Sequence, residues 1–308
     1  MTIRLQRLWT AFLALAVFAF AAAQVPEGTT SYELPGEGTF PEGIAYHAES
    51  GAAFVSGAGD GSLHRIDLAS GDVDTGLVPG SRPPFGIIGL AVGDDDLWAA
   101  GGMTGEILRF DVASGELEAT LSTPEAESTF LNDLVVAPNG DVYVTDSNRP
   151  VLFRVPDGGD EVEAWLDLDG TPIPFGEGIN LNGIVVSEDG ESLIVVHMAS
   201  GTLYRIDIAS RDVDPIDLGG ATVEAGDGMV LERTTLYIVQ NGPDQVSVVE
   251  LAGDLTRGEI VGVLEDERLT DAATAALAGD DLLVTNAQFS AMQGEPELPF
   301  TVSVVPIE

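Results

Sequence analysis

LHRIDLASGDV, at residues 63–73, is the segment that decides the fold, because similar segments recur along the whole chain. The further copies are ILRFDVASGEL at 107–117, LFRVPDGGDEV at 152–162, LYRIDIASRDV at 203–213, the degenerate VSVVELAGDL at 246–255 and VSVVPIE at 302–308. Their spacing of roughly 43 to 56 residues is typical of four-stranded propeller blades. The repeats therefore predict an all-β fold, a six-bladed β-propeller.

The third repeat shows the expected strands of one blade. Apolar and β-branched residues alternate over short runs that turn residues separate. The runs are DLVVA at 133–137, VYVTD at 142–146, VLFRV at 151–155 and EVEAWLDL at 161–168, with the turn PNGD at 138–141. Outside the N-terminal segment, a weak helical period occurs at the alanine-rich patch 272–278.

The sixth repeat lacks a fourth strand, because the sequence ends after its third. A spare strand, TSYELPG at 30–36, precedes the first repeat. We expect this segment to be the outer strand of the last blade, so that the two ends of the propeller join in one sheet. Such closure leaves short, protected sheet edges.

The first 23 residues have the layout of a secretory signal peptide. Arg4 and Arg7 precede an apolar run at 11–23 that is too short to span a bilayer and ends in small residues. Cleavage near Gln24 would leave 24–308 as a single propeller domain, exported to the periplasm or the extracellular space. A retained N-terminal anchor is the alternative. No later segment predicts a membrane span.

The chain is strongly acidic, with 12 basic residues, all of them arginine, against 51 acidic ones and a net charge of −39. Such a surface repels nucleic acid and anionic membranes and concentrates cations, so the expected partner is a small molecule. A salt-adapted or GC-rich source would also explain the acidity. The sequence has no cysteine, so stability must come from burial without disulfides. The oligomeric state cannot be read from it.

The starts of the first strands of the repeats form one set of aligned positions, which we expect to converge on the central channel. They are Glu42, Ile88, Asn132, Asn182, Asp227 and, in the sixth repeat, Ala273 or Thr274. Two carboxylates and two amides form a hard-oxygen set that suits one divalent cation, Ca²⁺ foremost, with Mg²⁺, Mn²⁺ or Zn²⁺ as alternatives. A hydrated channel lined by hydrogen-bonded side chains is the other interpretation.

The ends of the second strands form another set of aligned positions near the same channel mouth: Gly57, Gly101, Asp146, His197, Gln240 and Asn286. His197 is a candidate for proton transfer, because its ordinary pKa is near neutrality. Asp146 could orient a substrate or a water molecule. Gln240 and Asn286 are candidates to face the substrate. Hydrogen bonding to a loop carbonyl is the alternative role of His197.

The channel set resembles the family of gluconolactonase, senescence marker protein and luciferin-regenerating enzyme. The similarity covers nearly the whole chain after the signal segment and is carried by FPEGIAY at 40–46, LNDLVVAPNGDVYVTDS at 131–147 and NLNGIVVSEDGESLIVV at 180–196. It implies a cation near the channel top with Glu42, Asn182 and Asp227 as ligands. Asn132 would be a ligand or would face the substrate.

Phe130 departs from the family pattern. Sugar lactonases of the family place an arginine two residues before the first channel asparagine, and this chain has Phe130 there. A contact to polyols is therefore missing, while the cation site is unaffected. Phe130 is expected to face the substrate.

Together these features predict a metal-dependent hydrolase of a lactone or small ester, in which the cation polarises the carbonyl and Asp227 or His197 activates water. The alternative is a non-catalytic binding propeller with a structural Ca²⁺.

Overall fold

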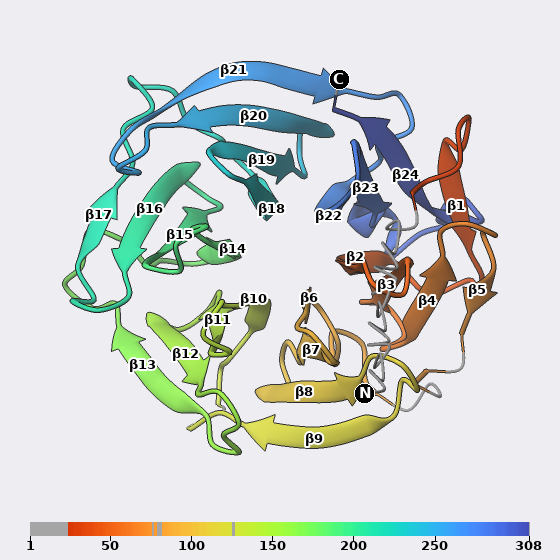
Figure 1. Cartoon of the computed structure of the whole chain (residues 1–308), viewed down its shortest axis with the longest axis horizontal. Coiled ribbons are helices and arrows are strands. Elements are labelled where there is room, and N and C mark those ends of the chain that lie inside the picture. The colour runs from red at the N-terminus through yellow and green to blue at the C-terminus, as the bar shows by residue number, and fades with distance from the viewer. Residues whose placement is uncertain (1–23, 76, 79–81, 125–126, 308) are drawn as a thin grey trace, which may run out of the picture.

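The computed structural model describes residues 24–75, 77–78, 82–124 and 127–307. Within these ranges the strands form six four-stranded antiparallel sheets, arranged as blades around a central channel (Figure 1). The predicted all-β, six-bladed propeller is therefore confirmed. The proposed signal segment, 1–23, lies outside the described residues. No helix among the described residues is long and apolar enough to cross a membrane.

The first five blades follow the chain outward from the channel to the rim. Their strands are β2 (Pro41–His47), β3 (Ala52–Gly57), β4 (Leu63–Asp67) and β5 (Val73–Asp74) in blade 1; β6 (Leu90–Val92), β7 (Asp96–Ala100), β8 (Glu106–Asp111) and β9 (Leu117–Ser122) in blade 2; β10 (Leu131–Val136), β11 (Val142–Asp146), β12 (Val151–Val155) and β13 (Glu163–Asp167) in blade 3; β14 (Leu181–Val186), β15 (Ser192–His197), β16 (Thr202–Asp207) and β17 (Val213–Pro215) in blade 4; and β18 (Gly226–Glu232), β19 (Thr235–Gln240), β20 (Gln245–Leu251) and β21 (Gly258–Glu265) in blade 5.

The sixth blade joins the two ends of the described chain. It contains β22 (Ala272–Ala278), β23 (Asp281–Asn286) and β24 (Phe300–Pro306), and β1 (Ser31–Leu34) is its outer strand. β1 pairs antiparallel with β24, with Leu34 opposite Phe300. The predicted closure by an N-terminal strand is confirmed.

The alanine-rich patch forms strand β22 rather than helix. Alanine favours helix intrinsically, but pairing with β23 and packing at the channel override that preference. The one short helix among the described residues is the 3-10 turn η1 (Phe289–Ala291), in the connection between β23 and β24.

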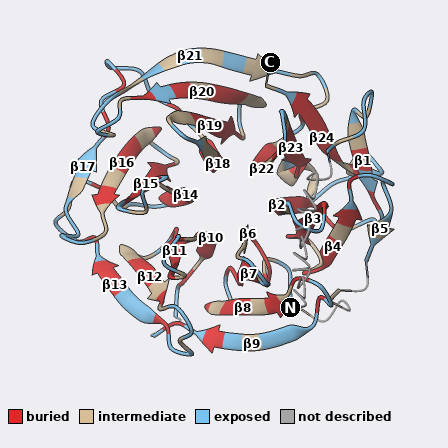
Figure 2. Cartoon of the chain, viewed as in Figure 1, coloured by how far each residue is buried: buried red, intermediate tan, exposed pale blue. Residues whose placement is uncertain are grey.

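Burial follows the distance from the channel. Inner strands are largely buried, whereas outer strands such as β13 and β21 are partly exposed to solvent (Figure 2). Apolar side chains of adjacent blades share cores: Phe54 of blade 1 packs in one cluster with Phe110 of blade 2. In blade 3, the Tyr143 and Trp165 rings meet edge to face at 4.9 Å between centroids. Such burial takes the place of disulfides in this cysteine-free chain.

The first strands approach one another so closely around the channel that glycine is needed beside the channel position. A Cβ on Gly43 would lie 2.3 Å from the Ile88 carbonyl oxygen, and one on Gly183 would lie 2.3 Å from the Asp227 carbonyl oxygen. Hydroxyl groups of second strands tie the same main chain together: Thr145 Oγ1 donates to the Asn182 carbonyl at 2.8 Å. The ring of first strands is thus fixed by backbone contacts.

A register shift occurs at the channel position of five first strands. The shifts lie between Pro41 and Ile44, Leu131 and Leu134, Leu181 and Ile184, Gly226 and Met229, and Ala272 and Ala275. Bulges of this kind re-aim a side chain at the end of a strand and are common beside functional sites. Here they turn the predicted channel residues towards the axis.

Candidate functional site

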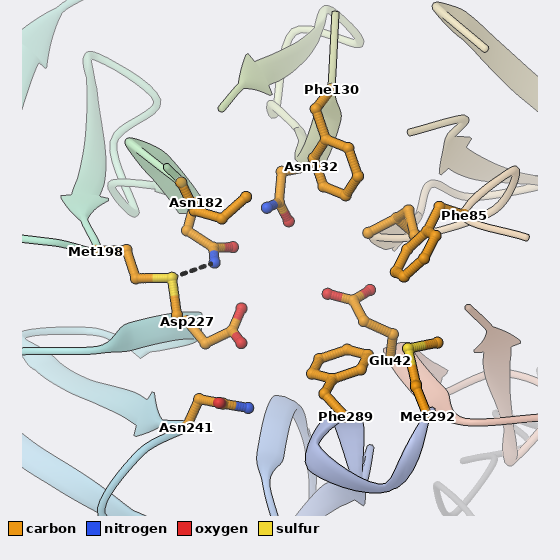
Figure 3. Close-up of a pocket in the computed structure, with 12 residues that line it drawn as sticks. Glu42, Phe85, Phe130, Asn132, Asn182, Met198, Asp227, Asn241, Phe289 and Met292 are labelled. Atoms are coloured by element: carbon orange, nitrogen blue, oxygen red, sulfur yellow. Dashed lines mark hydrogen bonds between the residues drawn. The ribbon is translucent and has the colours of Figure 1, made fainter. Parts of the chain in front are cut away.

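A cavity of about 230 Å³ opens where the first strands begin. Glu42 of β2, Asn132 of β10, Asn182 of β14 and Asp227 of β18 all line it, and their polar groups point to a common centre (Figure 3). Four residues that are far apart in the sequence, each from a different blade, are brought together as the strand alignment predicted. Ile88 lines the same cavity, so its blade contributes an apolar side chain.

These four polar side chains are almost completely buried, with at most 5% of their surface exposed. Glu42 Oε2 and Asn132 Oδ1 have no hydrogen-bond partner in the described structure. A buried oxygen without a partner costs free energy, and most such atoms in proteins are hydrogen-bonded, hydrated or bound to an ion. The two oxygens therefore indicate a place for a cation or for water.

Neighbouring groups orient the two amides. Asn132 Nδ2 donates to Ser147 Oγ at 2.9 Å, and Ser147 Oγ donates to the Leu181 carbonyl at 2.5 Å. Asn182 Nδ2 lies 3.5 Å from Met198 Sδ (Figure 3). The Asn132 nitrogen is thus held by Ser147, which leaves its carbonyl oxygen for the centre of the site.

The site concentrates negative charge. Burial raises the pKa of Asp227 to about 8; the charge of Asp133 adds to the rise and a hydrogen bond from Asn182 opposes it. Burial also raises the pKa of Glu42 well above its usual range, and Asp227 and Asp133 reinforce the rise. None of the described residues that line the cavity is basic. A bound cation would supply the counter-charge that these carboxylates lack.

The side chains of the site are of the kind that bind a hard cation. They do not form a cluster of acids or histidines. Among the described residues, no three His, Cys, Asp or Glu side chains gather in a way that could hold a metal ion. The polar side chains that line the cavity are two carboxylates and three amides, and carbonyl oxygens together with carboxylates are the usual ligands of Ca²⁺. Within the described part of the chain, no His or Cys side chain lines the cavity to favour Zn²⁺.

Asp133 is a third buried carboxylate of this region that the sequence analysis missed. It accepts hydrogen bonds from the main-chain N–H of Leu134 at 2.9 Å and of Ile184 at 3.2 Å. Burial raises its pKa to about 7, against the opposing effect of those two hydrogen bonds. It links β10 to β14 beneath the cavity residues and does not line the cavity itself. An acidic residue within an otherwise apolar strand was the feature of the sequence that could have identified Asp133.

The second set of aligned positions does not reach the cavity. Gln240 and Asn286 are candidates to face the substrate, yet both use their amides elsewhere: Gln240 Oε1 accepts from Ser247 Oγ at 2.6 Å, and Asn286 Nδ2 donates to Thr301 Oγ1 at 2.9 Å. The residue one position later lines the cavity in two blades, as Met198 and Asn241. Successive side chains of a strand point to opposite faces, so a shift of one position reverses the direction.

Asp146 is fully buried and acts within a hydrogen-bond network beside the cavity. It accepts from Thr129 Oγ1 at 2.5 Å, from the Phe130 N–H at 3.1 Å and from Arg149 Nε at 2.8 Å. The carboxylate therefore holds the segment that leads into β10. It does not line the cavity and positions Phe130, which does.

His197, the predicted proton-transfer group, is also outside the cavity lining. Its Nδ1 lies 2.8 Å from Ser200 Oγ. Burial lowers its pKa, against a smaller opposing effect of a backbone hydrogen bond with Pro174. Its neighbour Met198 takes the place at the cavity that the sequence analysis gave to the histidine.

The upper wall of the cavity is apolar and comes mainly from loops. Its members are Phe85, Ile88, Phe130, Ile179, Met198, Phe289 and Met292. Phe130, expected to face the substrate, does line the cavity, and its ring lies 6.1 Å from that of Phe85 between centroids. The remaining aromatic residues were missed because they lie in connections, where strand periodicity gives no information.

The fold and the site together define a six-bladed β-propeller with buried carboxylate and amide side chains that line a cavity where its first strands begin. Within that class the chain belongs to the SMP-30/gluconolactonase/LRE-like family, whose sequence pattern matches residues 40–288. The match includes all five polar residues that line the cavity. A comparison with curated protein sequences found no match.

Solved structures support the fold. A calcium-binding protein, regucalcin, from Agrobacterium tumefaciens is 20% identical with a TM-score of 0.66, over 90% of this chain and 95% of that one. A gluconolactonase from Xanthomonas campestris is 19% identical with a TM-score of 0.61, over 93% and 97%. The major allergen Mala s 1 of Malassezia sympodialis is 12% identical with a TM-score of 0.71, over 90% and 96%.

Proposed function

We propose that this protein is an exported hydrolase of a lactone or small ester that depends on one divalent cation, Ca²⁺. Glu42, Asn182 and Asp227 would bind the cation, and Asn132 would complete the set or face the substrate. The observation that carries the proposal is the pair of buried oxygens without partners, Glu42 Oε2 and Asn132 Oδ1, at the centre of an acidic cavity. The similar structures from Agrobacterium and Xanthomonas, a calcium-binding protein and a gluconolactonase, support the cation and the hydrolase respectively.

The cation would supply polarisation of the scissile carbonyl and stabilisation of the negative charge that develops on its oxygen. Asp227 is the candidate to accept the proton of the attacking water, because its carboxylate lines the cavity beside the proposed cation site. Water adds at the carbonyl carbon, the ring C–O bond breaks, and the proton passes to the departing alkoxide. The product is a hydroxy acid. Phe85 and Phe130 shield this reaction from bulk water.

Export is the second part of the proposal and rests on residues 1–23, which have the layout of a signal peptide. Expression of the full chain in a bacterial host, followed by N-terminal sequencing of the periplasmic or secreted protein, tests it. We expect the mature protein to begin near Gln24. Recovery of the uncleaved chain with the membrane fraction would show that the segment is a retained anchor.

The hydrolase is tested with protein from Gln24 onward, a panel of lactones and aryl esters, and calcium added after chelation. We expect hydrolysis of at least one substrate class that requires the cation. Asp227→Asn should abolish it, whereas Glu224→Gln, an exposed residue three positions away, should keep it. Calcium binding without hydrolysis of any substrate would favour the non-catalytic binding propeller with a structural Ca²⁺.

A further inference from the structure

The polar and the apolar side chains that line the cavity form two separate groups. Its polar side chains are Glu42, Asn132, Asn182, Asp227 and Asn241, and the rest of the lining is phenylalanine, isoleucine and methionine. The polar groups of the four proposed cation-site residues point to the centre of the site, and the rings of Phe130, Phe85 and Phe289 lie along one side of it (Figure 3). A substrate whose carbonyl lies at the cation site must therefore place the rest of its structure against apolar side chains.

Few polar groups are left for substrate hydroxyls. Asn241 is the one polar cavity residue outside the cation set, and its Nδ2 already donates to the Ala272 carbonyl at 3.1 Å. A sugar lactone carries several hydroxyls on its ring, and a hydroxyl that is buried without a partner costs free energy. The wall thus selects against polyhydroxylated substrates.

The aromatic wall is held in place before any ligand binds. The Phe130 N–H donates to Asp146 Oδ1 at 3.1 Å, and the Phe130 carbonyl accepts from the Ser147 N–H at 2.8 Å. Phe85 donates its N–H to the Ala58 carbonyl at 2.7 Å and has a φ of 56°, which is rare for a residue with a side chain. These hydrogen bonds fix the main chain of Phe130 and of Phe85, so the two rings form a preorganised apolar surface.

The loop that carries the third aromatic residue, Phe289, is also tied down. Gln288 Nε2 donates to the Glu297 carbonyl at 2.8 Å, and the Glu297 N–H donates back to Gln288 Oε1 at 2.8 Å. The Ser290 N–H donates to Asp271 Oδ2 at 2.7 Å. The three aromatic residues of the apolar wall are therefore carried by segments of blades 2, 3 and 6 that hydrogen bonds hold in place.

We infer that the substrate class is an apolar lactone or ester, one that carries an alkyl or aryl group in place of hydroxyls, and that Phe130 and Phe85 set this preference. This inference rests on the proposed hydrolase function of the same site. It deepens that function by naming the part of the substrate that the rings contact.

The test compares δ-lactones that bear alkyl groups of increasing length with δ-gluconolactone, which has the same ring size and bears hydroxyls. We expect kcat/KM to rise by about fourfold per methylene until the cavity is filled. δ-Gluconolactone should be poorer than the alkyl lactones by about tenfold or more. Equal or better hydrolysis of δ-gluconolactone would overturn the inference and leave the hydrolase function intact.

Binding of inert lactams separates the two proposals, because an amide ring of this type is not hydrolysed. Calorimetry with calcium-loaded protein should give tighter binding of an alkyl δ-lactam than of the polyhydroxylated gluconolactam. If no lactone is hydrolysed but the alkyl lactam still binds more tightly, the hydrolase proposal fails and the apolar preference holds. If neither lactam binds and no lactone is hydrolysed, both proposals are wrong.

Variants of Phe130 test whether the apolar wall causes the preference for alkyl over hydroxylated ligands. Phe130→Leu keeps an apolar side chain and should keep the ranking of alkyl over hydroxylated ligands. Phe130→Gln should reduce the ratio of alkyl-lactam to gluconolactam affinity by about tenfold or more. The melting temperature of each variant shows that it is folded, and Phe85→Leu and Phe85→Gln provide the same comparison on the facing ring. An unchanged ratio in both Gln variants would refute the role of the rings.

Discussion

Replacing Asp227 by asparagine should change stability in opposite directions without and with the cation. Asparagine has nearly the same shape but no charge. In the metal-free protein, Asp227 is buried near Asp133 and Glu42, so its ionised form is unfavourable. In the calcium-bound protein the same charge is a ligand. Asp227→Asn should therefore stabilise the metal-free protein and remove the stabilisation that calcium gives.

The magnitude follows from the raised pKa. A carboxyl with a pKa of about 8 in the folded protein and about 3.9 in the unfolded chain loses up to about 4 kcal/mol of folding stability by pH 7. The folded pKa lies above the unfolded one, so the contribution of Asp227 to the stability of the metal-free parent is fully present below about pH 4 and is lost as the pH rises towards about 8. Asp227→Asn has no carboxyl group at this position, so its stability should not show this pH-dependent loss. Calcium at a hundredfold excess over its Kd should stabilise the parent by about 2.7 kcal/mol.

The assay is thermal unfolding at pH 5 and pH 7, after chelation and after addition of calcium. We expect the Asp227→Asn protein to melt several degrees above the parent without calcium at pH 7, and to show no shift with calcium. Glu224→Gln, which removes one exposed charge, should behave as the parent. Equal calcium shifts in parent and Asp227→Asn would refute the assignment of this carboxylate to the cation site.

Three further outcomes follow from the structure. Gly183→Ala should lower the free energy of unfolding by about 2 kcal/mol or more in denaturant titrations, because its Cβ would meet the Asp227 carbonyl, while Gly176→Ala, with open space around it, should be close to neutral. Deletion of 24–34, which contains β1, should lower the melting temperature strongly because it unpairs β24; unfolding like that of the protein from Gln24 would contradict the importance of closure. His197→Gln should leave kcat and calcium affinity nearly unchanged, and a loss of about 10²-fold in kcat would restore the histidine as a proton-transfer group.

The repeat pattern made the fold and the central polar set predictable. Alternating strands and turn residues locate each blade, and the first strand of each blade lies innermost, beside the channel. Glu42, Asn132, Asn182 and Asp227 could therefore be placed together from their position in each repeat. The outer strand β1 could be assigned because one blade lacked a strand.

The direction of the second-strand side chains could not be predicted in the same way. Most second strands end at the predicted residues, among them His197 and Gln240, but in these two blades the residue after the strand lines the cavity instead of the last strand residue. Successive side chains point to opposite faces, so alignment of the strand ends alone does not give the direction. His197 was chosen for its chemistry, but Met198 is the residue that lines the cavity. Phe289 and Met292 lie in a long connection, and tertiary packing rather than a repeat brings them to the site.

The dependence of turnover on cation occupancy tests the central proposal most directly. Calcium is titrated into chelated protein from Gln24 onward, and the rate of lactone hydrolysis and the bound calcium are measured in the same samples at fixed pH. We expect the rate to rise in proportion to calcium occupancy and to saturate near one calcium per chain. Asp227→Asn should show neither calcium binding nor turnover. Full hydrolysis in the chelated protein, or saturation of the site without any change in rate, would contradict it.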